Sequence, residues 1–385
     1  AFAGDYLSAA SFLGICGMIA TAGYDGWMYA IGYLAGWMVA LFLVAEPMKR
    51  LGKNTFTDAL DSKFNSKGIQ LAAAISTLVI SVFYLIPQMV GAGVLVQPLL
   101  GMPHWVGVCI VGVVVTIIVA TAGMASTTYV QFFKGALLLI VSTVVVIAVL
   151  TRGLSSSPDQ GGTKPYHDFK TLPAIVAADG SLQVDGYTAP ADWKSNEFGK
   201  AGFVQLSQGD VETIWHVQEG TNGGYSLVET LFTTTLADGT KLFNGAAKED
   251  GKFFAVGHLK EVVVDGKEVA QTGALGPLAY LKTIKDSTIV LWGKKYVKVG
   301  DVKHTVYFQK PTPGERMLRP GLKFKVDNAT GTQKFNFISL MIALFCGTAA
   351  LPHILIRYYT VPSQAAARKS TIVAIAAIGF FYVLT

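Results

Sequence analysis

Long runs without a charged residue dominate both ends of the chain. Residues 26–45 contain no Asp, Glu, Lys or Arg, and neither do residues 68–133. A helix of about 20 residues is roughly 30 Å long, which matches the hydrocarbon core of a bilayer. With breaks at 99–104 and 122–126, the pattern predicts seven membrane helices, over residues 2–23, 26–45, 68–100, 103–123, 127–151, 335–359 and 364–384. We therefore expect an all-α polytopic membrane region rather than a soluble core with buried helices.

Residues 154–333 follow a different pattern. Asp-Gly pairs recur at 179–180, 185–186, 238–239, 250–251 and 265–266, several of them beside short runs typical of strands. Asp-Gly suits tight hairpin turns because glycine tolerates positive φ. Residues 289–309 alternate between apolar and polar, as strands do. The chain thus divides into membrane helices at 1–153, an inserted β-rich soluble domain at 154–333, and further membrane helices at 334–385.

Charge is distributed unevenly between these parts. Residues 154–327 carry 20 basic and 20 acidic residues, whereas the rest of the chain carries 11 basic and 5 acidic ones. The inserted domain has no basic stripe, so we expect no nucleic-acid partner. It also lacks metal-ligand spacing, a nucleophile motif and a phosphate loop, so we expect neither an enzyme nor a bound cofactor.

The basic residues of the membrane part predict its orientation. Eight of those 11 residues lie at 46–67 and 357–369, in two loops that share one side if the helices alternate. Loops rich in Lys and Arg face the cytoplasm. This pattern predicts a multi-pass membrane protein, with the bilayer as a partner and the inserted domain on the outer side. In a bacterium this would be the inner (plasma) membrane, with the inserted domain in the periplasm.

Two predicted helices contain residues that interrupt a helix. Residues 4–14 read GDYLSAASFLG and residues 346–353 read CGTAALPH. Gly and Pro weaken the helical hydrogen-bond ladder and free backbone groups, which need partners in hydrocarbon. A cation suits freed carbonyls and an anion suits a half-helix N-terminus, although close helix packing also explains Gly and Pro in membranes. Four helices separate the two, so they run in opposite directions, as the first members of two inverted five-helix repeats would.

Three ordered motifs resemble the sodium:solute symporter family, and within it the bacterial acetate permeases. Residues 4–14 with GYDG at 23–26 resemble the opening core helix, YLIPQMVGAG at 84–93 resembles the third, and GTAALPHILIRYYTV at 347–361 resembles the sixth. The resemblance implies a LeuT-type inverted-repeat core, present here in part. It also implies Na⁺ as coupling ion, held partly by the backbone carbonyls of Gly4 and Leu7. The inserted domain departs from the acetate permeases and is similar to a larger subgroup that is often accompanied by a small two-helix membrane subunit.

Polar side chains near the two breaks are the candidate solute ligands. They are Tyr6, Ser8, Ser11, Gln88 and Thr348. Ser11 matches the helix position that contacts sugar in the family's sugar carriers. Each of these side chains could instead cap its own helix or bond back to it.

Three ionisable residues are candidates for gating or coupling, namely Asp5, His353 and Arg357. An acid inside a membrane is a functional candidate by default, although Asp5 could also lie at the mouth of its helix. Arg357 could pair with an acid near the inner surface or extend to the interface as a snorkelling arginine.

These features favour a secondary active symporter that couples sodium to the uptake of a small organic anion. We expect a monocarboxylate such as acetate and alternating access, with proton coupling still open. A transporter-like membrane sensor and a structural subunit of a membrane complex are the alternatives. Because Ala1 and Thr385 both lie inside apolar stretches, we expect a longer protein, with core helix eight and its hydroxyl ligands beyond Thr385.

Overall fold

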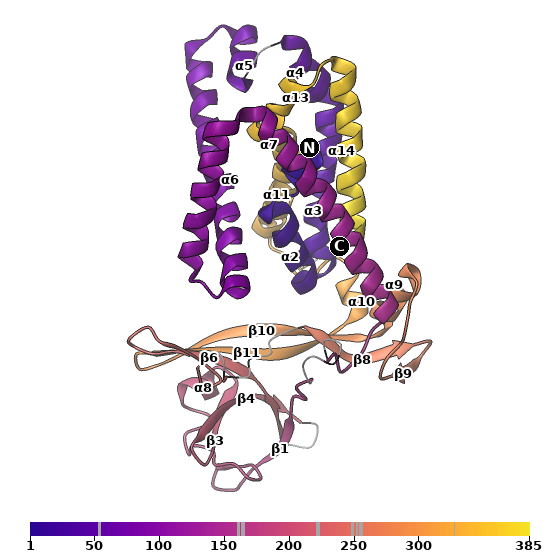
Figure 1. Cartoon of the computed structure of the whole chain (residues 1–385). Coiled ribbons are helices and arrows are strands. Elements are labelled where there is room, and N and C mark those ends of the chain that lie inside the picture. Colours follow the sequence, from indigo (N-terminus) through magenta and orange to yellow (C-terminus); the bar gives the residue numbers. More distant parts are fainter. Residues whose placement is uncertain are drawn as a thin grey trace. The chain divides into compact units, whose positions relative to one another are not determined.

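The computed structural model describes residues 1–385 except 53–54, 160–161, 163–165, 221–223, 248–249, 252, 254–256 and 327, and it describes 56, 98, 122, 124 and 125 by their backbone only. The chain forms a helical unit, Ala1–Leu150 with Arg316–Thr385, and a β-rich unit, Thr151–Glu315 (Figure 1). The β-rich unit therefore ends at Glu315, short of residue 333, and the residues from Arg316 onward pack with the helices.

The helical unit contains most of the apolar residues of the chain. Its elements are α1 (Phe2–Tyr6), η1 (Ala9–Gly14), α2 (Ile15–Ala22), α3 (Tyr24–Val39), η2 (Ala40–Val44), α4 (Ala45–Leu51), α5 (Phe56–Phe64), α6 (Lys67–Leu100), α7 (His104–Arg152), α11 (Gly331–Ala349), α12 (Pro352–Leu355), α13 (Arg357–Thr360) and α14 (Gln364–Leu384), with η1 and η2 being π-helical. Six helices in the described residues are long and apolar enough to cross a membrane, and Ala9–Ala22 is a shorter apolar helix. The protein is a multi-pass membrane protein.

α7 combines two of the predicted membrane helices. Gly123 interrupts it with φ 59° and ψ −167°, a backbone region that is essentially restricted to glycine. The spans on either side, His104–Thr121 and Ser126–Arg152, correspond to the predicted helices 103–123 and 127–151. The first predicted helix, in contrast, is divided into α1, η1 and α2.

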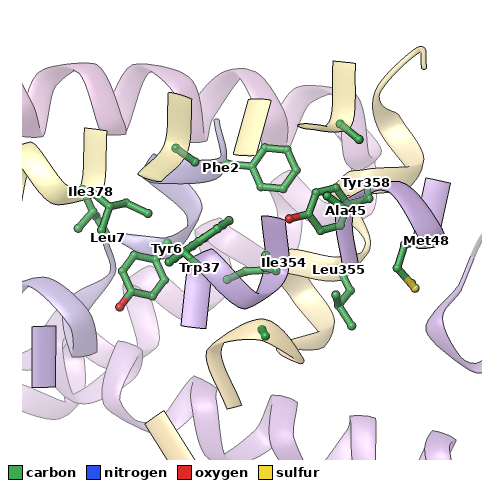
Figure 2. Packing of buried hydrophobic residues seen from close by; sticks show 14 of the residues in the cluster. Phe2, Tyr6, Leu7, Trp37, Ala45, Met48, Ile354, Leu355, Tyr358 and Ile378 are labelled. Atoms are coloured by element: carbon green, nitrogen blue, oxygen red, sulfur yellow. The ribbon is translucent and has the colours of Figure 1, made fainter. Parts of the chain in front are cut away.

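Aromatic side chains fill the core of the helical unit. Trp37 of α3 is fully buried and makes edge-to-face contacts with Phe2 and Tyr6 of α1, at ring-centroid distances of 6.1 and 5.7 Å. Phe2 also contacts Tyr358 of α13 at 5.1 Å. Figure 2 shows α1 packed in this way among residues from both ends of the chain. The two ends therefore share one hydrophobic core.

Asp25 holds the segment that precedes α11 against the N-terminus of α3. Its side chain is fully buried, and its carboxylate accepts hydrogen bonds from the backbone amides of Gly321, Lys323 and Phe324. Three N–H donors compensate for the buried charge. α11 then begins with a reciprocal cap between Thr330 and Gln333.

The β-rich unit contains two antiparallel sheets. The five-stranded sheet has the order β2-β1-β5-β4-β3 and the six-stranded sheet the order β7-β6-β11-β10-β8-β9. The strands are β1 (Thr171–Val176), β2 (Leu182–Gln183), β3 (Phe203–Gln208), β4 (Val211–Glu219), β5 (Tyr225–Glu229), β6 (Leu231–Thr235), β7 (Lys241–Phe243), β8 (His258–Val264), β9 (Lys267–Val269), β10 (Thr288–Val299) and β11 (Val302–Pro313). The helices are α8 (Glu197–Lys200), α9 (Pro277–Asp286) and α10 (Gly314–Met317).

Glycine turns connect these strands as the sequence predicts. Asp265-Gly266 forms a two-residue turn between β8 and β9, with positive φ at both residues. The glycines at 180, 186 and 239 also have positive φ. The predicted strands at 289–309 are the long β10–β11 hairpin, which closes on Gly300 and Asp301.

The two sheets pack on a shared apolar cluster. Phe203 and Ile214 of the first sheet contact Phe232, Val297 and Val306 of the second. A second cluster, around Trp215 and Leu227, is formed by buried side chains of the five-stranded sheet. These clusters make the unit a domain with its own core.

Candidate solute and ion site

The first helix breaks between α1 and η1. Leu7 leaves the helical conformation with ψ 84°, and Ser8 is extended. The Ser8 amide donates to Ser11 Oγ at 3.0 Å, and the Ala9 amide donates to Gln88 Oε1 at 3.0 Å. In an unbroken helix these amides would bond to the carbonyls of Gly4 and Asp5. Both carbonyls therefore lose their helical donors.

A second break separates α11 from α12. Leu351 leaves the helical conformation with ψ 119°, and Pro352 opens α12. Pro352 has no amide N–H to donate to the Thr348 carbonyl, four residues earlier. The structure thus confirms that both predicted helices are interrupted, and it places each interruption inside the predicted motif.

Tyr84 of α6 connects the two breaks. Its hydroxyl donates to Ser8 Oγ at 2.9 Å, and its ring lies 4.3 Å from the His353 ring of α12. α1 also contacts the segment that follows the second break, where the Phe2 ring lies 5.1 Å from the Tyr358 ring (Figure 2). The breaks are therefore side by side, as a shared binding site requires.

Two buried nitrogen atoms at this junction have no hydrogen-bond partner among the described residues. They are Nε2 of Gln88 and Nε2 of His353. Gln88 Oε1 accepts a hydrogen bond from the Ala9 amide. This bond identifies the other amide atom of the side chain as the nitrogen Nε2, which is a donor. A buried polar group without a partner costs about 1–3 kcal/mol. The two nitrogens are therefore the polar atoms of the junction that the described residues leave without a partner.

Four of the five candidate solute ligands lie at the first break. Tyr6 Oη is 3.1 Å from Tyr382 Oη, Ser11 Oγ donates to the Tyr6 carbonyl, and Ser8 accepts from Tyr84. Gln88 completes the group through the Ala9 amide.

Thr348, the fifth candidate, is occupied differently. Its hydroxyl donates to the Leu344 carbonyl of its own helix at 2.8 Å. Its Cβ lies so close to Gly36 that a side chain there would overlap it. These contacts give Thr348 a packing role between α11 and α3.

Gly4 and Leu7, the candidate sodium ligands, flank the point where α1 ends. The Leu7 side chain is buried, so the residue can offer its backbone carbonyl to the break and its side chain to the core. Gly4 lies against α7, where a Cβ would overlap the Gln131 carbonyl oxygen. Among the residues that the structure describes, no three His, Cys, Asp or Glu residues cluster as ligands of a metal ion. The break offers backbone carbonyl oxygens together with the hydroxyl oxygens of Ser8 and Ser11, and oxygen ligands suit a hard cation.

Asp5 and Arg357 form a buried ion pair across the two breaks. Arg357 Nε lies 3.2 Å from Asp5 Oδ2 and Nη2 lies 3.4 Å from Oδ1, while Nη1 donates to Thr128 Oγ1 at 2.7 Å. Both side chains are only 10% exposed, so Arg357 does not extend to the interface. A largely apolar cavity of about 540 Å³ borders Gly4, Thr128 and Arg357.

Sequence reasoning missed three partners in this region, namely Tyr84, Tyr382 and Thr128. Tyr84 precedes Gln88 by four residues on α6, so helical spacing alone would have placed both on one face. Tyr382 and Thr128 have no such local signal, because their partners lie 376 and 229 residues away along the chain.

Three comparisons relate the chain to known proteins. Residues 1–158 match the model of the sodium:solute symporter family. The uncharacterized symporter YwcA of Bacillus subtilis is 49% identical over 152 residues, which cover 40% of this chain and 30% of that protein. A monocarboxylic acid transporter of Corynebacterium glutamicum is 32% identical over 389 residues, which cover 100% of this chain and 46% of that protein. No solved structure matches the chain.

The family match over residues 1–158 covers the first break and all of its partners on α6 and α7. The relative from Corynebacterium glutamicum extends the similarity over the second break and the β-rich unit. The chain spans less than half the length of both relatives. Over residues 1–158, the chain is thus similar to the sodium:solute symporter family.

Proposed function

We propose that the protein couples sodium to the uptake of a small monocarboxylate, such as acetate, by alternating access. One observation carries the proposal: two broken helices meet at Tyr84, and Gln88 and His353 each present a buried nitrogen without a partner there. A carrier needs such a polar site at mid-depth, with interrupted helices around it.

The polar groups at the junction favour an anion with oxygen acceptors. Gln88 Nε2 is a donor, and His353 Nε2 is a donor in one of its two neutral tautomers. A carboxylate accepts two such bonds, and charged acceptors make stronger hydrogen bonds than neutral ones. The monocarboxylic acid transporter among the relatives is consistent with this class of solute.

Sodium fits the other side of the first break. The carbonyls of Gly4 and Asp5 have lost their helical donors, and Leu7 ends α1 beside them. The family resemblance assigns part of the sodium site to Gly4 and Leu7. A cation bound there would lie one helical turn from the solute ligands Ser8 and Ser11, so that each could favour the binding of the other.

The Asp5–Arg357 pair is proposed as a gate. The pair joins α1 to α13, and Thr128 of α7 accepts a hydrogen bond from Arg357. Moving α1 away from α13 therefore requires that this buried pair separate. Separation costs less when solute and cation together stabilise the rearranged helices. His353 contacts Tyr84 and precedes Arg357 by four residues, which makes it the candidate that couples the solute site to the gate.

Uptake into proteoliposomes tests the proposal. The full-length protein is expected to accumulate labelled acetate, propionate or pyruvate when a sodium gradient is applied. Gln88→Leu should raise the apparent KM about tenfold or more, because the amide donor is lost. Gln97→Leu, an exposed glutamine on the same helix, is the matched control and should leave KM unchanged. Uptake driven only by a proton gradient would show that the coupling ion is the proton and not sodium. If neither gradient drives uptake of any of the three acids, the proposal is overturned.

A further inference from the structure

A polar cavity lies between the two sheets of the β-rich unit. Its volume is about 430 Å³, which is within the range of small-molecule sites. Thr171 and Ser226 line it from the five-stranded sheet, and Lys260 and Gln309 line it from the six-stranded sheet. The segment before β1 closes it with Tyr166, Asp168 and Phe169.

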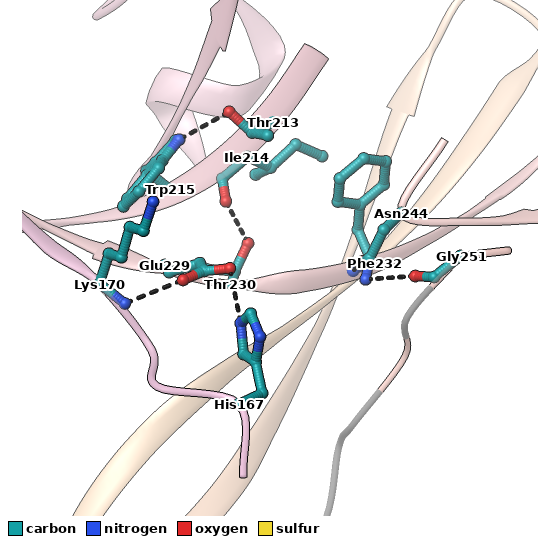
Figure 3. A network of polar contacts seen from close by, with 10 residues as sticks. All are labelled: His167, Lys170, Thr213, Ile214, Trp215, Glu229, Thr230, Phe232, Asn244 and Gly251. Atoms are coloured by element: carbon teal, nitrogen blue, oxygen red, sulfur yellow. Dashed lines mark hydrogen bonds and ion pairs between the residues drawn. The ribbon is translucent and has the colours of Figure 1, made fainter. Parts of the chain in front are cut away.

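Specific contacts hold this segment in place. Glu229, at the end of β5, pairs with His167 at 3.0 Å and accepts the Lys170 amide at 2.8 Å (Figure 3). The Glu229 amide donates back to the Lys170 carbonyl at 2.9 Å. Phe169 stacks on His258 with an interplanar angle of 10° and meets the edge of Trp292 at 5.1 Å. The wall that carries Tyr166 and Asp168 is therefore positioned by contacts on both sides of it.

Three polar groups in this cavity lack partners among the described residues. Gln309 Nε2 is buried and unbonded. Asp168 and Lys260 line the cavity as solvent-exposed residues, and neither belongs to an ion pair between described residues. Burial raises the pKa of the Tyr166 phenol and the Asp168 carboxylate raises it further, so Asp168 lies close to the aromatic wall. The cavity thus contains one unpaired anion, one unpaired cation and one unpaired amide donor.

We infer that this cavity binds a zwitterionic α-amino acid, whose ammonium group pairs with Asp168 and whose carboxylate binds Lys260 and Gln309 Nε2. The aromatic rings of Tyr166 and Phe169 would contact the amino acid's side chain. A simple carboxylate would be repelled by the like charge of Asp168, and a neutral sugar would use neither charge. The inference goes beyond symport, because no part of the cavity belongs to the helical unit.

The test measures binding by titration calorimetry, with the full-length protein in nanodiscs and L-alanine as the probe. Propionate lacks the ammonium group of L-alanine, and ethylamine lacks its carboxylate. We expect saturable binding of L-alanine in the cavity. Propionate and ethylamine should each bind there with an affinity at least about tenfold lower, because each lacks one charged contact.

Variants of the cavity then locate the binding. Asp168→Asn, Lys260→Met and Gln309→Leu should each weaken L-alanine binding about tenfold, and Asp168→Asn should at the same time strengthen propionate binding in this cavity. Asp301→Asn and Lys298→Met make the same chemical changes at the exposed end of the β10–β11 hairpin and should change neither.

Three results would overturn the inference. These are no saturable binding of L-alanine, L-alanine binding that all three cavity variants retain, and propionate binding that equals that of L-alanine and is lost in Lys260→Met. None of them bears on acetate uptake, which depends on residues of the helical unit. Failure of the amino-acid site and failure of the proposed transport are therefore separate outcomes.

Discussion

Gly4 combines a candidate ion-binding carbonyl with the closest approach between α1 and α7. A Cβ at this position would overlap the Gln131 carbonyl oxygen and crowd the Gly135 amide, and backbone cannot move aside as a flexible side chain does. We expect Gly4→Ala to lower stability by about 1–3 kcal/mol, as overpacking does, and to reduce sodium-dependent uptake. Thermal unfolding in detergent measures the first effect.

Gly17→Ala is the matched control for this substitution. Gly17 lies in α2 with open space where a Cβ would extend. Alanine is the better helix former by about 0.5–1 kcal/mol, so Gly17→Ala should preserve or raise the unfolding temperature. Equal unfolding temperatures for the two variants would show that α1 and α7 can separate without cost.

The buried Asp5–Arg357 pair links α1 to α13 through two side chains. Removing one partner leaves a buried charge uncompensated, which costs about 3–5 kcal/mol. We expect Asp5→Asn and Arg357→Gln each to destabilise strongly, and the double variant to recover part of the loss. A double-mutant cycle by thermal unfolding measures the coupling.

The exposed pair between Arg368 and Glu46 provides a comparison within the same unit. Its atoms are 3.2 Å apart, as close as those of the buried pair, but its side chains are 59% and 35% exposed. The coupling free energy of the Arg368–Glu46 pair should stay below about 1 kcal/mol. A coupling for Asp5–Arg357 as small as that of this surface pair would remove the physical basis for a gate.

Among the structural elements, one strand of each sheet contains a histidine near the shared apolar cluster. His216 of β4 lies 4.7 Å from the Phe308 ring, and His304 of β11 lies 5.1 Å from the Phe198 ring. Burial lowers the pKa of His216, and Lys295 and Lys310 lower it further. Burial also lowers the pKa of His304, although Glu212 opposes this.

These shifts predict acid sensitivity of the β-rich unit. A lowered folded-state pKa means that the unfolded chain binds more protons, so stability falls as the pH drops below the usual histidine value of 6.5. Above that pH the contribution is complete and stability should be constant. Pulse proteolysis in urea, at pH values on either side, measures the slope. The His216→Leu, His304→Leu double variant should flatten it, and an unchanged slope in that variant would assign the acid sensitivity to other groups.

The sequence predicted the elements that have local causes. The two helix breaks follow from Gly, Ser and Pro within short motifs, and the hairpin turns follow from Asp-Gly pairs. The π-helical turns η1 and η2 have no such signal, and neither does the bond between Tyr84 and Ser8, whose partners are 76 residues apart. The end of the β-rich unit was also misplaced, because the segment from Arg316 is fixed by Asp25, almost 300 residues earlier.

For the whole molecule, the order of the spans argues for one orientation. Between the basic loop at 46–67 and the β-rich unit the chain has three candidate spans, Lys67–Gln97, His104–Thr121 and Ser126–Arg152. An odd number of crossings puts the β-rich unit on the side opposite to that loop. The span Gly331–Leu355 then returns the chain to the side of the second basic loop, at 357–369. Since basic loops face the cytoplasm, the β-rich unit is expected in the periplasm of a bacterium.

Cysteine labelling of the intact membrane tests this orientation. With Cys16, Cys109, Cys346 and any cysteine outside residues 1–385 replaced by alanine, Asp301→Cys places a thiol in the exposed β10–β11 turn, and Lys63→Cys places one on α5. A membrane-impermeant maleimide should label Asp301→Cys in intact spheroplasts, but Lys63→Cys only after permeabilisation. Full labelling of both thiols in detergent controls for reactivity. Labelling of both from the same side would require an even number of crossings between them, and one of the three apolar spans would then lie along the membrane instead of crossing it.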